Sequence, residues 1–159
     1  LTGVANRRHL FARTEDALAD ARRRNVPLAV LMIDVDRFQE VNGAHGHGTG
    51  DEVLRVVAER LTAGLRPTDL IGRYAGEEFA AVLPGAAERA EAVAERLRRA
   101  VEEEPVAVGG ARITVTVSVG VARLRDADAT LSTLVARAEA ALYLAKHTGR
   151  NRVESDLLG

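Results

Sequence analysis

The 159-residue chain contains no cysteine and no tryptophan, and only 3% of its residues are aromatic. Without cysteine it forms neither disulfides nor thiolate sites, which fits a reducing compartment such as the cytoplasm. Few rings are available to stack on bases, and 22 basic residues against 23 acidic ones leave no excess positive charge for a polyanion. Nucleic acid is therefore not an expected partner.

Long apolar runs are also missing. No segment reaches the roughly 18 apolar residues of a membrane span, and no signal peptide opens the chain. We expect a cytoplasmic domain that makes no membrane contact, which leaves open that the full-length protein is membrane-tethered. The length is that of one domain and the first residue is Leu1, so we expect 1–159 to be a single catalytic domain excised from a longer sensor protein.

Hydrophobic periodicity and turn residues predict alternating helices and strands. The segment LAVLMIDV is apolar almost throughout, which is typical of a strand covered on both faces. Predicted helices cover 6–24 with Asn6 as N-cap, a short stretch from Arg37, about 51–63, 86–103 and 130–148. Predicted strands cover 28–35, 69–75, 79–83 and 113–122, with a short edge strand within 151–155.

The order strand-helix-strand-strand-helix-strand predicts an α+β fold whose mixed central sheet has a split βαβ core, ferredoxin-like or palm-like, surrounded by helices. In that topology the first two strands run parallel and the third lies between them. The exit of strand 28–35 then lies beside the turn of the hairpin. Asp34 and Asp36 should therefore meet Glu77 and Glu78.

These acidic residues point to a divalent cation, because like charges crowded at a tight turn repel one another. Mg²⁺ prefers hard oxygen ligands and usually takes one or two carboxylates together with substrate phosphates. Alternatively, Asp36 caps the helix that begins at Arg37, and exposed glutamates are common in hairpin turns. The predicted convergence of two segments favours the metal site.

The segment FQEVNGAHGHGTGD, residues 38–51, has four glycines, which allow backbone amides to approach a phosphate or a base closely. Asn42 and Asp51 flank these glycines, and an aspartate can accept from the ring N–H and the exocyclic amine of guanine together. The alternative is a flexible loop with Asp51 as helix N-cap. His45 and His47 have no third ligand nearby, which favours hydrogen bonding in the loop over metal binding.

Two further pairs of charged residues remain. Lys146 and Arg150 lie four residues apart across a helix end, and Lys146 is the single lysine among 22 basic residues. A compact ammonium suits phosphate, although interaction with the helix dipole would also explain the pair. Arg66 and Asp69 flank a proline turn, either as a surface ion pair or as a pair that reads guanine.

In this order the segments resemble the GGDEF family of diguanylate cyclases almost from end to end. The matching stretches are LTGVANRR, MIDVDRFQEVNGAHGHGTGD, RPTDLIGRYAGEEF, VTVSVGVA and ALYLAKHTGRNRV. The resemblance implies condensation of two GTP into cyclic di-GMP, with release of two pyrophosphates. It also implies a homodimer in which each domain holds one GTP, and cyclic di-GMP as product and inhibitor.

The resemblance carries roles to individual positions. It implies Asp34, the carbonyl of Val35 and Glu77 as ligands of Mg²⁺ or Mn²⁺, with Glu77 also deprotonating the ribose 3′-hydroxyl and Glu78 completing the catalytic signature. For the substrate it implies guanine contacts from Asn42, Asp51 and His47, and phosphate contacts from Lys146, Arg150, Phe38 and Gln39. For the inhibitory product it implies Arg66 and Asp69.

The sequence departs from the family at three positions. Ala75 replaces the first glycine of the signature, which would strain a turn that needs positive φ there. Gln39 stands where a lysine is common and removes a positive charge from the phosphate site, and Gly43 replaces an aspartate. We therefore keep two alternatives: a degenerate domain that binds GTP or cyclic di-GMP without turnover, and another palm-like nucleotidyl transferase or cyclase.

Overall fold

Strand β1 (Leu28–Val35) is buried along its whole length at the centre of a five-stranded sheet. The computed structural model describes residues 3–128 and 130–156, so the predicted domain 1–159 extends slightly beyond it. The other described elements are α1 (Arg7–Arg24), α2 (Phe38–His45), α3 (His47–Ala63), β2 (Leu70–Ala75), β3 (Glu78–Pro84), the 3₁₀ helix η1 (Ala87–Arg89), α4 (Ala90–Glu102), β4 (Val106–Val108), β5 (Ala111–Ile113), β6 (Val117–Arg123), α5 (Leu131–His147) and β7 (Val153–Ser155).

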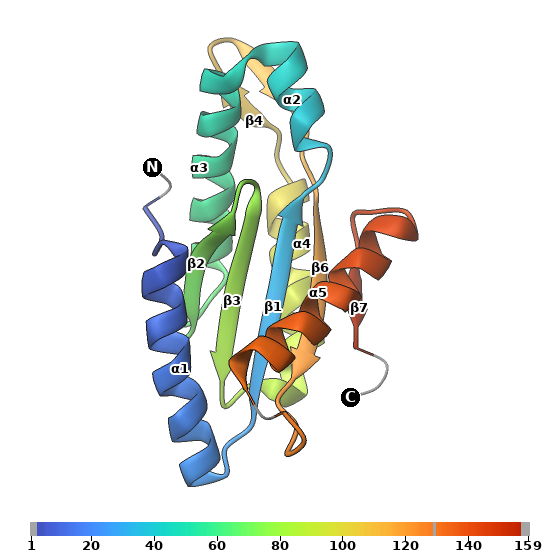
Figure 1. Ribbon diagram of the computed structural model, residues 1–159. Coiled ribbons are helices and arrows are strands. Elements are labelled where there is room, and N and C mark those ends of the chain that lie inside the picture. The colour runs from blue at the N-terminus through green and yellow to red at the C-terminus, as the bar shows by residue number, and fades with distance from the viewer. Residues whose placement is uncertain (1–2, 129, 157–159) are drawn as a thin grey trace.

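The sheet has the strand order β2-β3-β1-β6-β7 (Figure 1). Strand β3 lies between β1 and β2 and is antiparallel to both, so β1 and β2 run parallel, as predicted. Strand β6 is antiparallel to β1, and the short edge strand β7 is parallel to β6. The predicted α+β fold with its split βαβ core is confirmed.

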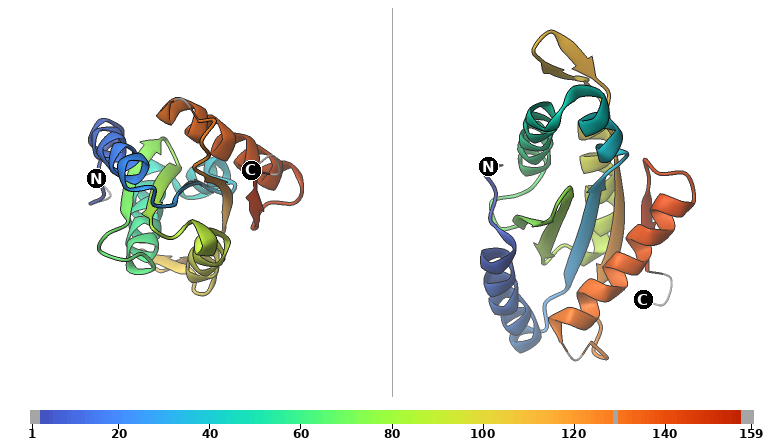
Figure 2. Two further views of the ribbon diagram at one scale, coloured as in Figure 1. Left: turned by 90° about the horizontal axis from the view of Figure 1, so that it is seen from below. Right: turned by 45° about the horizontal axis from the view of Figure 1, so that its top comes forward.

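Helices cover both faces of the sheet (Figure 2). Alternate residues of β1 point to opposite faces, so Leu31 and Ile33 join the core under α3 and α4, whereas Val30 and Met32 pack beneath α1 and α5. This two-sided burial explains why β1 is a continuous apolar run. None of the helices in the described part of the chain is long and apolar enough to cross a membrane.

The chain before α1 is attached to the edge of the sheet. Ala5 forms an isolated parallel bridge with Gly72 of β2, and its carbonyl accepts a hydrogen bond from the Arg73 amide at 2.8 Å. Helix α1 then begins at its predicted cap, where the Asn6 side chain accepts from the His9 amide at 2.9 Å. The helix ends at Asn25, which has left-handed backbone angles.

Two predicted boundaries are wrong. The segment 113–122 is not one strand: β5 ends at Ile113, pairs with β4 in a separate hairpin, and the sheet strand β6 starts only at Val117. The glycine-rich segment is not a loop either, because α2 continues to His45 and α3 starts at His47 rather than near 51. Gly46, at φ 89°, is the only one of its four glycines at positive φ.

Candidate active site

The turn between β2 and β3 lies against the exit of β1 (Figure 1). The Val35 amide donates to the Glu77 carbonyl at 3.2 Å, and Asp34 is paired in register with Glu78. The positive φ of this turn falls on Gly76, at 40°, and not on Ala75. The strain expected for a Cβ at position 75 is therefore absent.

Asp34 and Glu77 line one cleft of 340 Å³, which we call the acidic cleft. Its lining also includes most of the residues predicted to contact metal or phosphate: Val35, Phe38, Gln39, Lys146 and Arg150, together with Asp36, Arg37 and Glu40. Glu78 is half-buried on the first residue of β3, outside this lining. Segments more than a hundred residues apart in sequence thus meet at one end of β1.

The surroundings of Asp34 disfavour the charged form of its carboxyl, and its side chain is only 4% exposed. Burial raises the pKa of its carboxyl to about 6; the Lys146 ammonium, 3.1 Å from Oδ2, opposes this shift, while Glu77 and Glu78 add to it. Burial also raises the pKa of Glu78. Three carboxylates against one ammonium leave excess negative charge at this point.

A divalent cation fits this donor set. Carboxylate and carbonyl oxygens are the ligands that Mg²⁺ prefers, and a bound cation would offset both the burial and the carboxylate repulsion that raise the pKa of Asp34. Within the described residues, no three His, Asp or Glu side chains are grouped so that they could hold a metal by themselves. Ligands from a substrate or from water would therefore have to complete the coordination shell.

A second cleft, of 630 Å³, lies beside the first, and we call it the Asn42 cleft. Its polar lining includes the predicted base-binding residues Asn42, His47 and Asp51. The Asn42 Oδ1 atom is buried against Gly50 and accepts no hydrogen bond from the described residues. A buried acceptor without a donor is costly, so a rotation that brings the Asn42 amide to a donor in the cleft would be favourable.

The glycines shape the Asn42 cleft differently from our expectation. Asp51 is inside α3, so the alternative in which it caps that helix is wrong. Gly50 leaves room for the Asn42 side chain, because a Cβ there would lie 1.8 Å from Asn42 Oδ1. His45 ends α2 and lines a different groove, so the two histidines do not share a loop.

The two clefts share Phe38, Gln39 and Glu77 in their linings. Arg73 and Leu54 also line the Asn42 cleft, although we did not predict them. Arg73 is anchored by its Nε, which donates to the Gly76 carbonyl at 2.8 Å. The sequence signal for Arg73 was its place two residues before the signature turn.

Lys146 and Arg150 reach the acidic cleft from the end of α5. This helix lies directly on the backbone of β6, since a Cβ on Gly120 would be 2.2 Å from the Ala138 carbonyl oxygen. The close approach determines how far α5 stands from Asp34, with which Lys146 pairs. Arg150 follows the helix, in left-handed backbone conformation at φ 62°.

Asp36 does not cap the helix that follows it. No side chain in the described part of the chain caps α2. The Asp36 carboxylate, 5% exposed, accepts from the Thr116 and Ser118 hydroxyls and from the Asn151 amide. Neither role considered for Asp36, metal ligand or helix cap, accounts for the three hydrogen bonds that its carboxylate accepts.

Arg66 and Asp69 lie at the opposite end of the β2–β3 hairpin from the glutamates. Arg66 donates to the Pro84 carbonyl at 3.0 Å, and six residues of β3 at about 3.4 Å each separate Pro84 from Glu78, roughly 20 Å. The Asp69 side chain, 2% exposed, accepts from the Arg66 amide and guanidinium. The Arg66 side chain remains 42% exposed.

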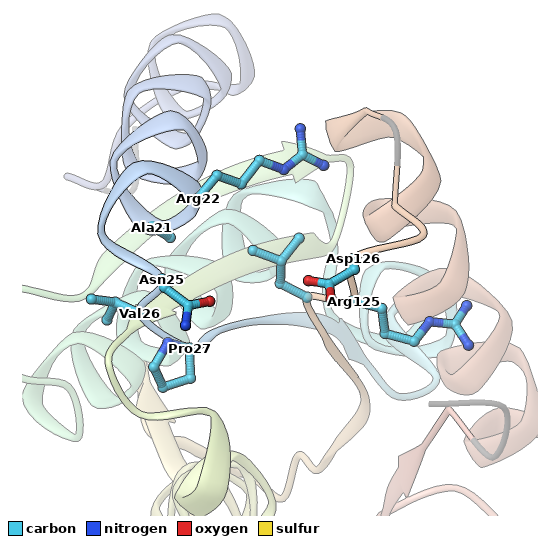
Figure 3. Close-up of a pocket in the computed structure, with 8 residues that line it drawn as sticks. Ala21, Arg22, Asn25, Val26, Pro27, Arg125 and Asp126 are labelled. Carbon is cyan, nitrogen blue, oxygen red and sulfur yellow. The ribbon is translucent and has the colours of Figure 1, made fainter.

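A further hollow of 440 Å³ lies between the C-terminal end of α1 and the segment after β6 (Figure 3). Arg22, from its α1 side, donates to the Asp128 carbonyl. Strand β1 begins at this end and Asp34 stands at the other, so the hollow is remote from both clefts. No residue predicted for the site lines it.

The chain is similar to known proteins both in sequence and in structure. The family described as "Diguanylate cyclase, GGDEF domain" matches residues 1–152. Diguanylate cyclase DosC of Escherichia coli (strain K12) is 42% identical over 156 residues, 97% of this chain; the chain spans only 34% of the length of that protein.

Solved structures agree with the sequence comparison. The GGDEF domain of DgcB from Caulobacter crescentus, in complex with c-di-GMP, superimposes with a TM-score of 0.92 at 32% identity, covering 98% of this chain and 90% of that one. The active GGEEF domain of a diguanylate cyclase from Vibrio cholerae gives 0.89 at 34% identity, covering 96% and 97%.

Proposed function

This chain belongs to the GGDEF family of diguanylate cyclase domains, and from that membership we propose that it condenses two GTP molecules into cyclic di-GMP with release of two pyrophosphates. The observation that carries the proposal is the position of Glu77, which lines both the acidic cleft and the Asn42 cleft. A nucleotide spanning the two clefts would present its ribose and α-phosphate beside this carboxylate.

The Asn42 cleft would hold guanine. Asn42 Oδ1, which lacks a donor, can accept from the base, and the Asp51 carboxylate can accept from the ring N–H and exocyclic amine. His47 and Arg73 would enclose the base from α3 and β2. Adenine presents an acceptor where guanine presents that ring N–H, so the same donors and acceptors would disfavour ATP.

The acidic cleft would hold the triphosphate. Lys146 and Arg150 would neutralise phosphate charge, and the backbone at Phe38 and Gln39 would line the phosphate path. Asp34, the Val35 carbonyl and Glu77 would hold Mg²⁺ or Mn²⁺; members of this family generally use a divalent metal, which when bound polarises phosphate oxygens and stabilises developing charge. Glu77 would accept the proton of the 3′-hydroxyl, with Glu78 beside Asp34 supporting the acidic cluster.

Cyclic di-GMP needs two guanylate units, whereas each chain supplies one Asn42 cleft. We therefore propose that two domains face each other in a homodimer, each with one GTP. Activity should then rise more steeply than linearly with protein concentration. For product inhibition, the half-exposed Arg66 guanidinium would contact cyclic di-GMP, while Asp69, buried against the turn, would hold Arg66 in place.

The direct test is incubation of the domain with GTP and Mg²⁺ or Mn²⁺, followed by chromatography of the products. We expect cyclic di-GMP from the unsubstituted chain and at least about a 100-fold lower rate from Glu77→Gln, because the proton acceptor is lost. Glu88→Gln, an exposed position in η1, is the matched control and should keep full activity. Absence of product from a folded, concentrated sample would refute the proposal.

Gln39 favours one alternative, a domain that binds nucleotide without turnover. Its uncharged side chain lines both clefts where a lysine would have added positive charge. Calorimetry that shows tight GTP or cyclic di-GMP binding, with no product in the assay above, would select this alternative. Preference for ATP over GTP in the same calorimetry would instead select another nucleotidyl transferase.

A further inference from the structure

The Asp36 carboxylate is the acidic group of the sequence motif that the proposed function leaves without a role. Its side chain is buried at the end of β1, and its oxygens already have three donors. Thr116 and Ser118, on the neighbouring β6 side, donate through their hydroxyls at 2.7 Å each. The third donor is the Asn151 backbone amide, at 3.0 Å, which comes from the turn that follows α5.

That turn has an unfavourable backbone. Arg150 and Asn151 have φ values of 62° and 47°, so two consecutive residues with a Cβ occupy the left-handed region that L-residues disfavour. Such a conformation persists only where contacts hold it. Here the Asp36 carboxylate holds the Asn151 amide, while Arg98 and Glu102 of α4 bind the Asn151 side chain.

The Arg150 guanidinium depends on this turn for its direction. Within the described residues it makes no hydrogen bond and no ion pair, although it lines the acidic cleft. Lys146 differs, because it projects from α5 itself and is paired with Asp34. Among the described residues, the backbone of the turn therefore aims Arg150 at the cleft: the Arg150 amide donates to the Ala145 carbonyl of α5 and the Asn151 amide to Asp36, at 3.0 Å each.

We propose that Asp36 is a positioning residue: by binding the Asn151 amide, its carboxylate fixes the 149–151 turn so that Arg150 reaches the β- and γ-phosphates of the bound nucleotide. The inference rests on the proposed function for the identity of the ligand as a guanosine triphosphate. It requires no cyclisation, so binding measurements test it separately from turnover.

The test is a double-mutant cycle on binding of α,β-methylene-GTP with Mg²⁺, measured by calorimetry. The methylene bridge prevents loss of pyrophosphate, so binding is observed without reaction. We expect Asp36→Ala and Arg150→Ala each to weaken binding about 10-fold, the effect of losing a hydrogen bond to a charged group. The double variant should also be about 10-fold weaker, rather than about 100-fold, because both changes remove the same phosphate contact.

Three controls separate positioning from general damage. Asn42→Ala, in the other cleft, should combine additively with Asp36→Ala. Thr116→Val removes a different donor from the same carboxylate, so it should lower the melting temperature and leave the affinity within twofold. GMP, which lacks the β- and γ-phosphates, should bind the unsubstituted chain and Asp36→Ala equally.

Additive losses in the Asp36–Arg150 cycle, or equal weakening of GMP, would overturn the inference whether or not the domain makes cyclic di-GMP. If Asp36→Ala does not fold, Asp36→Asn takes its place in the cycle, since it removes the charge and one acceptor oxygen from the same side chain and keeps its volume. A non-additive cycle in a domain without cyclase activity would uphold the positioning role and refute only the proposed function.

Discussion

Alanine at position 50 should damage nucleotide binding without damaging the fold. A Cβ on Gly50 would lie 1.8 Å from Asn42 Oδ1 and 3.0 Å from its Cγ, whereas real Cβ atoms essentially never approach another heavy atom to less than 3.0 Å. These contacts, and a third with Phe38 Cζ at 3.1 Å, are with side chains and not with backbone. Asn42 can therefore rotate away, and it would leave the position from which it faces the cleft.

The expected loss of nucleotide affinity follows from the rotation of Asn42. Losing the Asn42 contact and leaving a guanine donor unpaired costs about 1–3 kcal/mol, or roughly a 5- to 150-fold weaker affinity. The stability of the fold should not decrease, for two reasons. Glycine within a helix costs about 1 kcal/mol relative to alanine, and rotation of Asn42 out of its position removes a buried acceptor without a partner. The melting temperature should hold or rise.

Calorimetry with α,β-methylene-GTP and thermal melting measure the two effects. Gly48→Ala is the matched control, because it lies in the same helix with nothing within 4 Å of an added Cβ, so it should gain stability and keep affinity. Unchanged nucleotide affinity in Gly50→Ala would refute the reasoning. So would an equal loss of affinity in Gly48→Ala, because that would implicate helix stiffness rather than Asn42.

Three further predictions concern other parts of the molecule. Gly120→Ala should destabilise the fold by about 1–3 kcal/mol, because its Cβ would meet the backbone of α5; an unchanged melting temperature would contradict the close packing. Burial opposes ionisation of Asp128, but hydrogen bonds from Arg137 and from the Arg125 amide outweigh it and hold the pKa of that carboxyl below its usual value. This stabilisation is present above the unfolded pKa of about 4 and is lost as the pH falls through the lower folded pKa. The melting temperature of Asp128→Asn should therefore fall less steeply below pH 4 than that of the unsubstituted chain. If the two proteins show the same dependence of melting temperature on pH, Asp128 does not contribute. Arg66→Ala should weaken cyclic di-GMP binding at least about 10-fold while leaving α,β-methylene-GTP binding intact, and equal affinity for cyclic di-GMP would dismiss Arg66 as a product contact.

The fold could be predicted because its strongest signals are local. A strand covered on both faces is apolar almost throughout, which identifies β1 directly, and Asn6 caps the start of its helix with a side-chain acceptor. Strand order then followed from general topology rules. The β4–β5 hairpin was missed although its Gly109–Gly110 turn, with both φ values positive, is a strong hairpin signal.

The site was predictable in its residue types and less so in their arrangement. The convergence of Asp34 and Glu77 follows from topology alone, and both line one cleft. The roles of glycine did not follow, because a sequence cannot distinguish a glycine that bends the chain from one that admits a neighbour. Gly46 belongs to the first kind and Gly50 to the second. Asp36 required the structure, since its donors lie 80 or more residues away.

The attachment of Ala5 to β2 has a mechanical consequence. A force applied to the chain on the N-terminal side of Ala5 acts on the 2.8 Å hydrogen bond between the Ala5 carbonyl and the Arg73 amide before it acts on the first turn of α1. Arg73 also lines the Asn42 cleft, and its guanidinium donates a hydrogen bond to the Gly76 carbonyl in the turn between β2 and β3. A pull or twist on the chain at Ala5 would thus act on the bulged end of β2, three residues from Gly76.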